Sequence, residues 1–432
     1  MVSNKTSIDA NGTEYVSGPP EFDWDPKMQG FLLSSFFYGY LITQVPGGYL
    51  SSKYGGKNLF GLGILMTALF TLITPVTARW SPYALAVVRM FEGLFEGVTF
   101  PCMHAIWGKW APPFERSKLV TISMSGPFAG TVVGMSGSGI IAHNMGWPWV
   151  FYLFGIFGIL WSVAWFSLVT DYPKDHHKIS HAELKHILDA LKDDHVDRNV
   201  VKTPWGQFFR SPAVWAIIAA HVAENWGWYT LLTQLPTYLK KILHFSLQEA
   251  SFISSLPYLA MVIVVQCGGR LADFLRRKNI LSTTAVRRVF NTVGFISQAG
   301  FLIVVGYTTS KEIAIVGLTF AVGLGGFTWS GFPVNHLDIA PRYAGILLGI
   351  SNCLATIPGI FSPVVVGILT PNETQAEWRS VFFIAAGIYA VGMIVYACFA
   401  SGEKQPWADG MDEVEAADEM HPLVNPTGDK HD

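Results

Sequence analysis

Long apolar stretches dominate this chain, and they restrict its fold more than any other feature. A helix needs about 20 apolar residues to cross a bilayer, and eleven such stretches follow one another along the 432 residues. They do not alternate between apolar and polar residues, so we do not expect strands there. Only 14% of the residues are charged, against about 25% in soluble domains. We predict an all-α integral membrane protein with spans at 28–50, 58–78, 82–107, 118–142, 148–170, 212–238, 250–269, 287–307, 312–333, 344–369 and 379–400.

The composition also argues against several classes of function. A net charge of −2 does not favour binding to nucleic acid. The four cysteines all lie in apolar segments, so we expect neither a disulfide framework nor a metal site. No cofactor motif is present: Gly323–Gly326 lies inside a span without a following Lys-Ser/Thr, unlike a phosphate-binding loop. We therefore expect no cofactor and no enzyme activity.

The basic residues and the glycosylation sequons predict one orientation in the membrane. If the polar first 27 residues lie outside the cytosol, 21 of the 29 Lys and Arg fall on the cytosolic side. Three sequons, at Asn4, Asn11 and Asn372, then fall outside. We expect a glycosylated extracytosolic segment (1–27), an N-terminal bundle of five spans (28–170), a cytosolic linker (171–211), a C-terminal bundle of six spans (212–400) and an acidic cytosolic tail (401–432).

A short motif that occurs twice indicates duplicated halves. Gly48-Tyr-Leu-Ser-Ser-Lys-Tyr-Gly-Gly-Lys57 follows the first span, and Gly269-Arg-Leu-Ala-Asp-Phe-Leu-Arg-Arg277 follows the seventh. One more span precedes the motif in the second half than in the first. We therefore expect one helix of the first half to be missing from the front, and we expect the chain as written to transport poorly.

Two local patterns predict helix features. Ser180-His-Ala-Glu183 has the form of a capping box, so a surface helix should begin in the linker. Gly126, Gly130, Gly134 and Ser138 form a ridge of small residues, which we expect to pack closely against another helix.

The span at 82–107 carries an unusual set of ionisable residues. At about 100° per residue, Arg89, Glu92, Glu96 and His104 fit on one stripe of a continuous helix. A charge at the centre of a membrane helix costs about 2.5–3.5 kcal/mol, so these groups must pair or face a wet cavity. A structural ion pair would account for Arg89 and one carboxylate. The second carboxylate favours a path for protons or substrate.

Other polar and aromatic residues within the spans are candidates for the same path. His221 and Glu224 lie three residues apart, so they should share a face, and Glu224 is a second protonatable candidate or a partner for a neighbouring helix. Phe36 and Tyr40 lie one turn apart and could line a cavity or simply pack. Tyr229 and Asn352 form either part of a substrate site or hydrogen bonds between helices.

Several segments resemble the major facilitator superfamily and, within it, the organic-anion branch of the anion:cation symporters. The matching segments are Phe36-Phe-Tyr-Gly-Tyr-Leu-Ile-Thr-Gln-Val-Pro-Gly-Gly48, Glu92-Gly-Leu-Phe-Glu-Gly-Val-Thr-Phe-Pro101, Trp110-Ala-Pro-Pro-Phe-Glu-Arg-Ser117, Asn335-His-Leu-Asp-Ile-Ala-Pro341 and Tyr343-Ala-Gly-Ile-Leu-Leu-Gly-Ile350. The resemblance implies two pseudo-repeated helical bundles with about 11 transmembrane helices here instead of 12. It also implies proton-coupled transport of small organic anions across lysosomal or vesicular membranes.

The resemblance further implies roles for individual residues. Arg89 would help to hold the substrate, Glu92 and Glu96 would couple transport to protons, and His104 would be functionally sensitive. In the mechanism that we infer, protonated Glu96 leaves Arg89 free to attract a substrate carboxylate, and deprotonated Glu96 pairs with Arg89 and expels the anion. Glu224 stands where relatives carry an arginine or an aromatic residue. The alternatives are a Na⁺-dependent phosphate or inorganic-anion cotransporter and a non-transporting shortened product.

Overall fold

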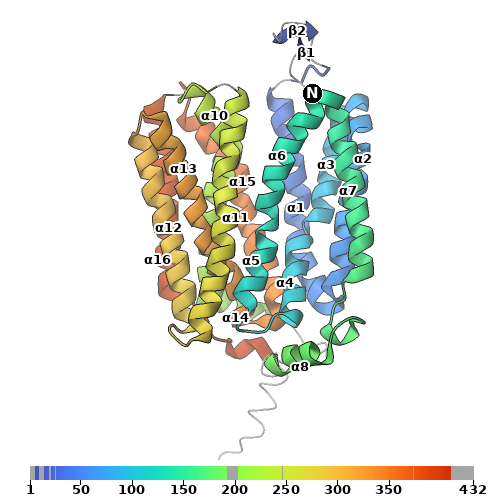
Figure 1. The fold of residues 1–432 in the computed structure, drawn as a ribbon, viewed down its shortest axis with the longest axis vertical. Helices are drawn as coiled ribbons and strands as arrows, with labels where there is room; N and C mark the ends of the chain where they lie inside the picture. The colour runs from blue at the N-terminus through green and yellow to red at the C-terminus, as the bar shows by residue number, and fades with distance from the viewer. Residues whose placement is uncertain are drawn as a thin grey trace, which may run out of the picture.

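The computed structural model describes residues 5–8, 14–18, 21–24, 26–191, 203–245, 247–372 and 374–409. In this part of the chain, two helical bundles stand side by side, with helices α1 to α7 in one and α10 to α16 in the other (Figure 1). An antiparallel strand pair, β1 (Lys5–Ile8) and β2 (Glu14–Gly18), lies beyond one end of the bundles. Helix α8 (His181–Ala190) lies at the other end.

The helices match the eleven predicted spans. The first half contains α1 (Pro26–Tyr54), α2 (Gly56–Trp80), α3 (Pro82–Glu96) with α4 (Thr99–Trp110), α5 (Arg116–Met124) with α6 (Gly126–Met145), and α7 (Trp147–Leu168). After η1 (Pro173–Asp175), α8 and α9 (Trp205–Arg210), the second half contains α10 (Pro212–Lys241), α11 (Leu247–Arg277), α12 (Thr283–Tyr307), α13 (Lys311–Gly325) with η3 (Gly326–Ser330) and α14 (Phe332–Ile339), η4 (Pro341–Tyr343), α15 (Ala344–Leu369), α16 (Gln375–Phe399) and η5 (Pro406–Asp409).

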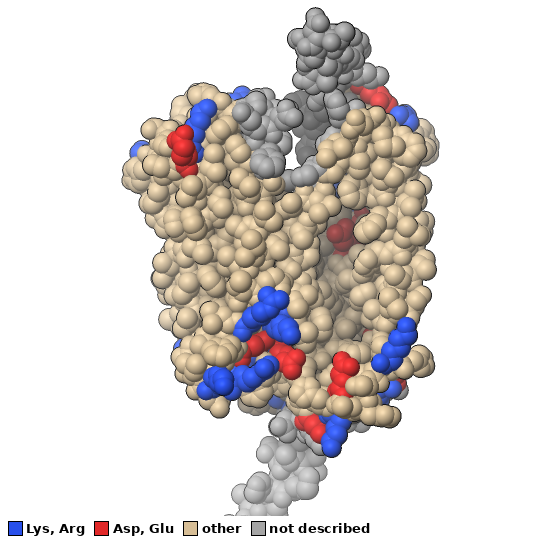
Figure 2. Space-filling model, viewed as in Figure 1, with Lys and Arg blue, Asp and Glu red and all other residues tan. Residues whose placement is uncertain are grey.

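The outer surface of the bundles is apolar, as a bilayer requires. Seven helical segments of the described residues are long and apolar enough to cross a membrane by length and composition alone. The span formed by α7 is only 11% buried inside the protein although its mean hydropathy is 1.8. On the face drawn in Figure 2, charged side chains gather near the two ends and leave a broad belt between them. This is a multi-pass membrane protein.

The packing of the helices confirms the duplication that the repeated motif predicts. In the first half α1 packs against α3, and α2 packs against α3 and α7. In the second half α11 packs against α13, and α12 packs against α13 and α16. The contacts between halves repeat as well, because α1 packs against α15 of the second half and α11 packs against α5 and α6 of the first.

One span of each half is interrupted within the membrane: the third span of the first half and the corresponding fourth span of the second half. The first break falls at Gly97 and Val98, between α3 and α4, and the second is η3, between α13 and α14. Beyond the first break, His104 contacts the second half through the Pro333 carbonyl oxygen, whereas Glu92 contacts α2.

Two local predictions have opposite outcomes. The Ser180 hydroxyl accepts a hydrogen bond from the Glu183 amide, so α8 is capped as predicted. The expected close packing of the glycine ridge is wrong, because a Cβ atom placed on Gly126, Gly130 or Gly134 would have no neighbour within 4 Å. This face of α6 borders open space. The helix packs against α7 and α11 with its other sides.

Asp273, in the second copy of the repeated motif, ties the two halves together at the α8 end. Helix α11 continues eight residues past the predicted end of the span, and this extension carries Asp273 to the start of α5. Its carboxylate accepts hydrogen bonds from the backbone amides of Ser117 (3.2 Å) and Lys118 (2.6 Å). The unpaired amides at a helix N-terminus favour an anion at this place. The first copy has Ser52 at the equivalent position, so only one half supplies this acid.

A buried arginine also joins the two halves at this end. Arg287 of α12 is fully buried and donates to the Asp338 carboxylate at 2.6 Å and to the Ser117 hydroxyl at 2.8 Å. Arg276 donates to the Pro113 carbonyl oxygen at 2.6 Å. These contacts hold the segment between α4 and α5 against the second half, so the space between the bundles is closed at the α8 end.

Candidate functional site

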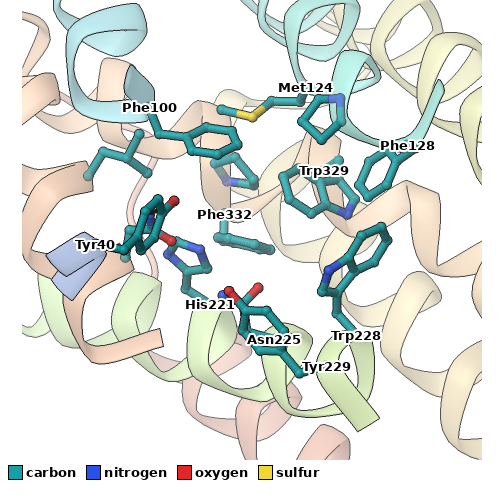
Figure 3. Close-up of a pocket in the computed structure, with 14 residues that line it drawn as sticks. Tyr40, Phe100, Met124, Phe128, His221, Asn225, Trp228, Tyr229, Trp329 and Phe332 are labelled. Carbon is teal, nitrogen blue, oxygen red and sulfur yellow. Dashed lines mark hydrogen bonds between the residues drawn. The ribbon is translucent and has the colours of Figure 1, made fainter. Parts of the chain in front are cut away.

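A cavity of about 160 Å³ lies between the two halves. Side chains from α1, α4, α5 and α6 form one side, and side chains from α10, η3, α14 and α15 form the other (Figure 3). Figure 2 shows a recess in the first half, beside α6, with an acidic surface inside it. The residues that line the cavity are Tyr40, Phe100, Met124, Pro127, Phe128, His221, Asn225, Trp228, Tyr229, Trp329, Phe332, Pro333, Leu348 and Asn352.

A polar contact between the halves forms one wall of the cavity. The Asn352 amide of α15 donates to the Tyr40 hydroxyl at 3.1 Å and to the Gln44 side-chain oxygen at 3.0 Å, both on α1. Asn225 of α10 donates to the Ala355 carbonyl oxygen at 2.9 Å, which positions its side chain against α15. These amides and the tyrosine can bind the hydroxyl or carbonyl groups of a small solute.

Aromatic rings form the opposite wall. Phe128 of α6 meets Trp228 of α10 edge to face at 4.6 Å between ring centroids, and it meets Trp329 of η3 at 5.1 Å. Trp228 also packs against Tyr258 of α11. Because rings packed on one another keep their orientation, this wall is a rigid apolar surface. It suits the apolar face of an organic molecule.

Beside the cavity, Arg89 and Glu92 form an ion pair of 2.8 Å, three residues apart on α3. The Glu92 carboxylate is buried and also accepts hydrogen bonds from Thr71 and Thr74 of α2, at 3.1 and 3.3 Å. Arg89 keeps 32% of its side chain exposed, and its guanidinium lies 5.2 Å from the centre of the Phe36 ring. Phe36 stacks in turn on Tyr40 of the cavity wall.

Glu96 differs from Glu92 in its surroundings. Its carboxylate lies within electrostatic range of Arg89 and Glu92 on its own helix and of Tyr40 on α1. Within the described part of the chain, it has no hydrogen bond and no ion pair within 4.0 Å. One carboxylate of the stripe is therefore held in place, and the other can gain or lose a proton without breaking a contact.

Glu224 lies apart from the cavity, behind the aromatic wall. Its carboxylate is buried and accepts a hydrogen bond of 2.9 Å from Gln298 of α12. Among the described residues no Lys or Arg forms an ion pair with it. Its own small cavity is closed by Trp228, Tyr258 and Tyr389. His221 and Glu224 lie on adjacent turns of α10 but contact different helices: His221 contacts Ser351 of α15, and Glu224 contacts Gln298 of α12.

Three histidines meet under the cavity. His104 of α4 and His336 of α14 both contact the Pro333 carbonyl oxygen at 3.0 Å, with ring centroids 5.7 Å apart. His221 of α10 reaches the same cluster through the Ser351 hydroxyl at 3.1 Å. His336 was not among the candidates from sequence. None of the described His, Cys, Asp and Glu residues form a group that could hold a metal ion.

The sequence candidates therefore fall into three places. Tyr40, Tyr229 and Asn352 line the cavity, whereas Phe36, Arg89, Glu92 and Glu96 lie beside it and Glu224 lies behind it. Sequence reasoning missed the aromatic wall. The stripe of His221, Asn225, Trp228 and Tyr229 on α10 has helical spacing and could have indicated it. Asn372 lies in an exposed turn, and Asn4 and Asn11 fall outside the described residues.

The solved structures that resemble this chain show the same fold. A double tryptophan variant of XylE matches with a TM-score of 0.72 at 16% identity, covering 91% of each chain. The proton:xylose symporter XylE bound to 6-bromo-6-deoxy-D-glucose matches with a TM-score of 0.69 at 15% identity, also over 91% of each chain. At this identity the likeness concerns the fold alone.

The sequence relatives are much closer. Human sialin is 51% identical over 422 residues, which cover 94% of this chain and 85% of sialin. Human vesicular glutamate transporter 2 is 44% identical, over 95% of this chain and 70% of its own length. The family model described as Major Facilitator Superfamily matches residues 19–363. With two pseudo-repeated bundles around a central cavity, the chain belongs to the major facilitator superfamily, as a membrane transporter of the family that includes sialin and the vesicular glutamate transporters.

Proposed function

We propose that this chain moves small organic anions across a membrane together with protons, by alternating access of the cavity to the two sides. The candidates for the anion are sialic acid, acidic sugars and acidic amino acids. The relatives named sialin and vesicular glutamate transporter support this class of substrate. We further propose a lysosomal or vesicular membrane as the location, with the C-terminus in the cytosol.

The unequal surroundings of two carboxylates carry this proposal. Glu92 neutralises Arg89 and is hydrogen-bonded to α2, so its role is to hold Arg89 in place. Glu96 has no such contact and lies within electrostatic range of the same arginine. A proton on Glu96 leaves Arg89 with one carboxylate, so that its exposed side can attract a substrate anion. Loss of that proton adds a second negative charge, which competes with the substrate anion for Arg89.

The cavity suits an organic anion better than inorganic phosphate. Tyr40, Asn225 and Asn352 offer hydrogen bonds on one side, and Trp228 and Trp329 offer an apolar face on the other. A small, fully hydrated phosphate would leave the aromatic wall unused, whereas a sugar or amino acid has apolar carbon to place there.

Uptake into proteoliposomes tests the proposal. The chain as written is expected to transport poorly, so uptake should be slow. We expect any accumulation of N-acetylneuraminate, glucuronate or L-glutamate by the purified chain to follow an imposed pH gradient and to show no requirement for Na⁺. With one proton per anion, one pH unit supplies about 1.4 kcal/mol and sustains about a tenfold concentration ratio. Protein-free vesicles are the control. Uptake that follows a Na⁺ gradient and is insensitive to pH would instead identify a Na⁺-driven cotransporter.

The proposed orientation has its own test. The strand pair lies at one end of the molecule and α8 lies at the other. The N-terminal segment and the linker are therefore placed on opposite sides of the membrane. We expect protease added to the cytosolic side to cut between α8 and α9, and glycosylation to occur at Asn4, Asn11 or Asn372 in cells. If the protease cuts the linker only when it is added to the opposite side, the proposed orientation is wrong.

A further inference from the structure

The histidine cluster under the cavity has an unusual bridging group. His221, His336 and His104 are each at most 5% exposed. The Ser351 hydroxyl lies between two of them, 3.1 Å from Nδ1 of His221 and 2.9 Å from Nε2 of His336. The other nitrogen of His336, Nδ1, lies 3.0 Å from the Pro333 carbonyl oxygen. A continuous chain of short polar contacts thus runs from His221, which lines the cavity, to Pro333 at the contact with the first half.

The chemistry of Pro333 fixes the hydrogens in this chain. A carbonyl oxygen only accepts, so Nδ1 of His336 must carry a hydrogen and donate it. In neutral His336, Nε2 is then an acceptor. The Ser351 hydroxyl donates to it at 2.9 Å in preference to the Leu348 carbonyl oxygen, which lies farther away at 3.2 Å. Because a hydroxyl has one hydrogen, the contact with His221 is satisfied only if Nδ1 of His221 donates to the serine oxygen. This leaves Nε2 of His221 as a base on the cavity side.

One proton can therefore move along the chain with every atom accounted for. A proton from the cavity binds Nε2 of His221. The hydrogen on Nδ1 of His221 passes to the Ser351 oxygen, and the hydrogen of that hydroxyl passes to Nε2 of His336. His221 ends neutral, and Ser351 ends as a hydroxyl that donates back to Nδ1 of His221. His336 ends as an imidazolium that donates to Ser351 and to Pro333. Return of the proton to the cavity reverses these steps.

The groups around His336 limit the cluster to one added proton. His104 approaches from α4, and it donates Nε2–H to the same Pro333 oxygen. Two imidazolium rings with centroids 5.7 Å apart would repel each other strongly in a buried site. From α10, His221 faces the cluster through Ser351, and a charge there would oppose a charge on His336 in the same way.

Four other ionisable groups on elements near the cluster have partners elsewhere. Asp338, on α14 with His336, pairs with Arg287 of α12. Tyr40 of α1 is hydrogen-bonded to Asn352. Lys109, on α4 with His104, lies over the Tyr172 ring. Glu224, on α10 with His221, turns to α12.

We propose that His221, Ser351 and His336 form a proton relay and storage site in the second half of the transporter, which loads from the cavity and holds the proton at His336. This inference rests on the proposed proton-coupled transport. The site is separate from Glu96, which belongs to the first half. His336 lies two residues before Asp338 on α14, so a proton stored there lies next to the contacts that close the α8 end.

The test separates proton movement from substrate movement in proteoliposomes that contain the full chain. N-acetylneuraminate and L-glutamate serve as probes, and a pH-sensitive dye inside the vesicles reports the protons that enter with them. We expect Ser351→Ala to lower substrate-driven acidification by about tenfold or more, because no other group of the described residues bridges the two rings. Substrate counterflow, which needs no net proton movement, should stay within about twofold of wild type.

Matched variants exclude a merely structural effect. Ser362 lies on the same helix, is fully buried, and its hydroxyl has no hydrogen-bond partner in the described part of the chain. Ser362→Ala should therefore leave the proton-to-anion ratio unchanged, and Ser351→Thr, which keeps the hydroxyl, should restore most of the acidification. His336→Gln provides a second variant that lacks the storage site, and it should behave as Ser351→Ala does.

The outcomes also separate this inference from the proposed function. If wild type carries the probe without protons, proton coupling itself is wrong, and the relay is wrong with it. If wild type couples the probe to protons and Ser351→Ala and His336→Gln keep the wild-type ratio, the relay alone is wrong.

Discussion

Replacing Glu96 with glutamine should abolish the accumulation of substrate along a pH gradient while the protein still folds. The amide permanently resembles the protonated acid, so Arg89 stays available to the anion and the proton no longer controls its release. Since one proton per anion corresponds to about a tenfold ratio per pH unit, the loss should be about tenfold for each imposed unit. Folding should survive because the Glu96 carboxylate has no hydrogen bond or ion pair to lose among the described residues. The measurement is substrate uptake with and without a pH gradient, compared with substrate counterflow.

Glu92→Gln is the matched control on the same helix. The amide oxygen can still accept from Thr71 and Thr74, but the charge that neutralises Arg89 is lost. We expect a less stable protein with an altered affinity for the substrate. Its substrate uptake should still depend on the pH gradient. If Glu96→Gln still concentrates substrate along the gradient as wild type does, the controlling proton lies elsewhere, and the unpaired Glu224 becomes the next carboxylate to test.

Asp338→Asn should destabilise the transporter by about 3–5 kcal/mol, because it leaves a buried arginine without its counter-charge. The Arg287 guanidinium is fully buried, and its Nε lies 2.6 Å from the Asp338 carboxylate. Arg276, also buried, lies 3.8 Å from the same carboxylate and 3.7 Å from Asp273, so the variant would leave two buried cations with Asp273 as the remaining nearby carboxylate. Thermal unfolding of the purified protein in detergent measures the loss.

Two further variants test the reason for this loss. Arg79→Gln breaks a surface pair with Glu21, whose side chains are 51% and 29% exposed, and it should cost at most about 1 kcal/mol. The double variant Arg287→Met/Asp338→Leu removes both buried charges and should recover much of the stability. An unfolding temperature for Asp338→Asn equal to that of wild type would contradict the role of this pair.

The sequence alone determined the features that depend on local periodicity and on hydropathy. Runs of about 20 apolar residues can satisfy their backbone hydrogen bonds in a bilayer only as helices, so the eleven spans were predictable. The repeated motif was enough to predict two related halves. The sequence also predicted an ion pair of Arg89 with one of the two carboxylates on its helix face, and the structure shows that the partner is Glu92.

The tertiary structure decided which of these residues meet residues from distant segments. His104, beyond the break at Gly97 and Val98, contacts Pro333, which lies 229 residues along the chain. Ser351 bridges His221 and His336 only because α10, α14 and α15 converge, and nothing in their spacing along the chain requires it. A helix period states which side chains share a face but not what packs against that face, so the cavity, its aromatic wall and the surroundings of Glu224 depend on helix packing between distant segments.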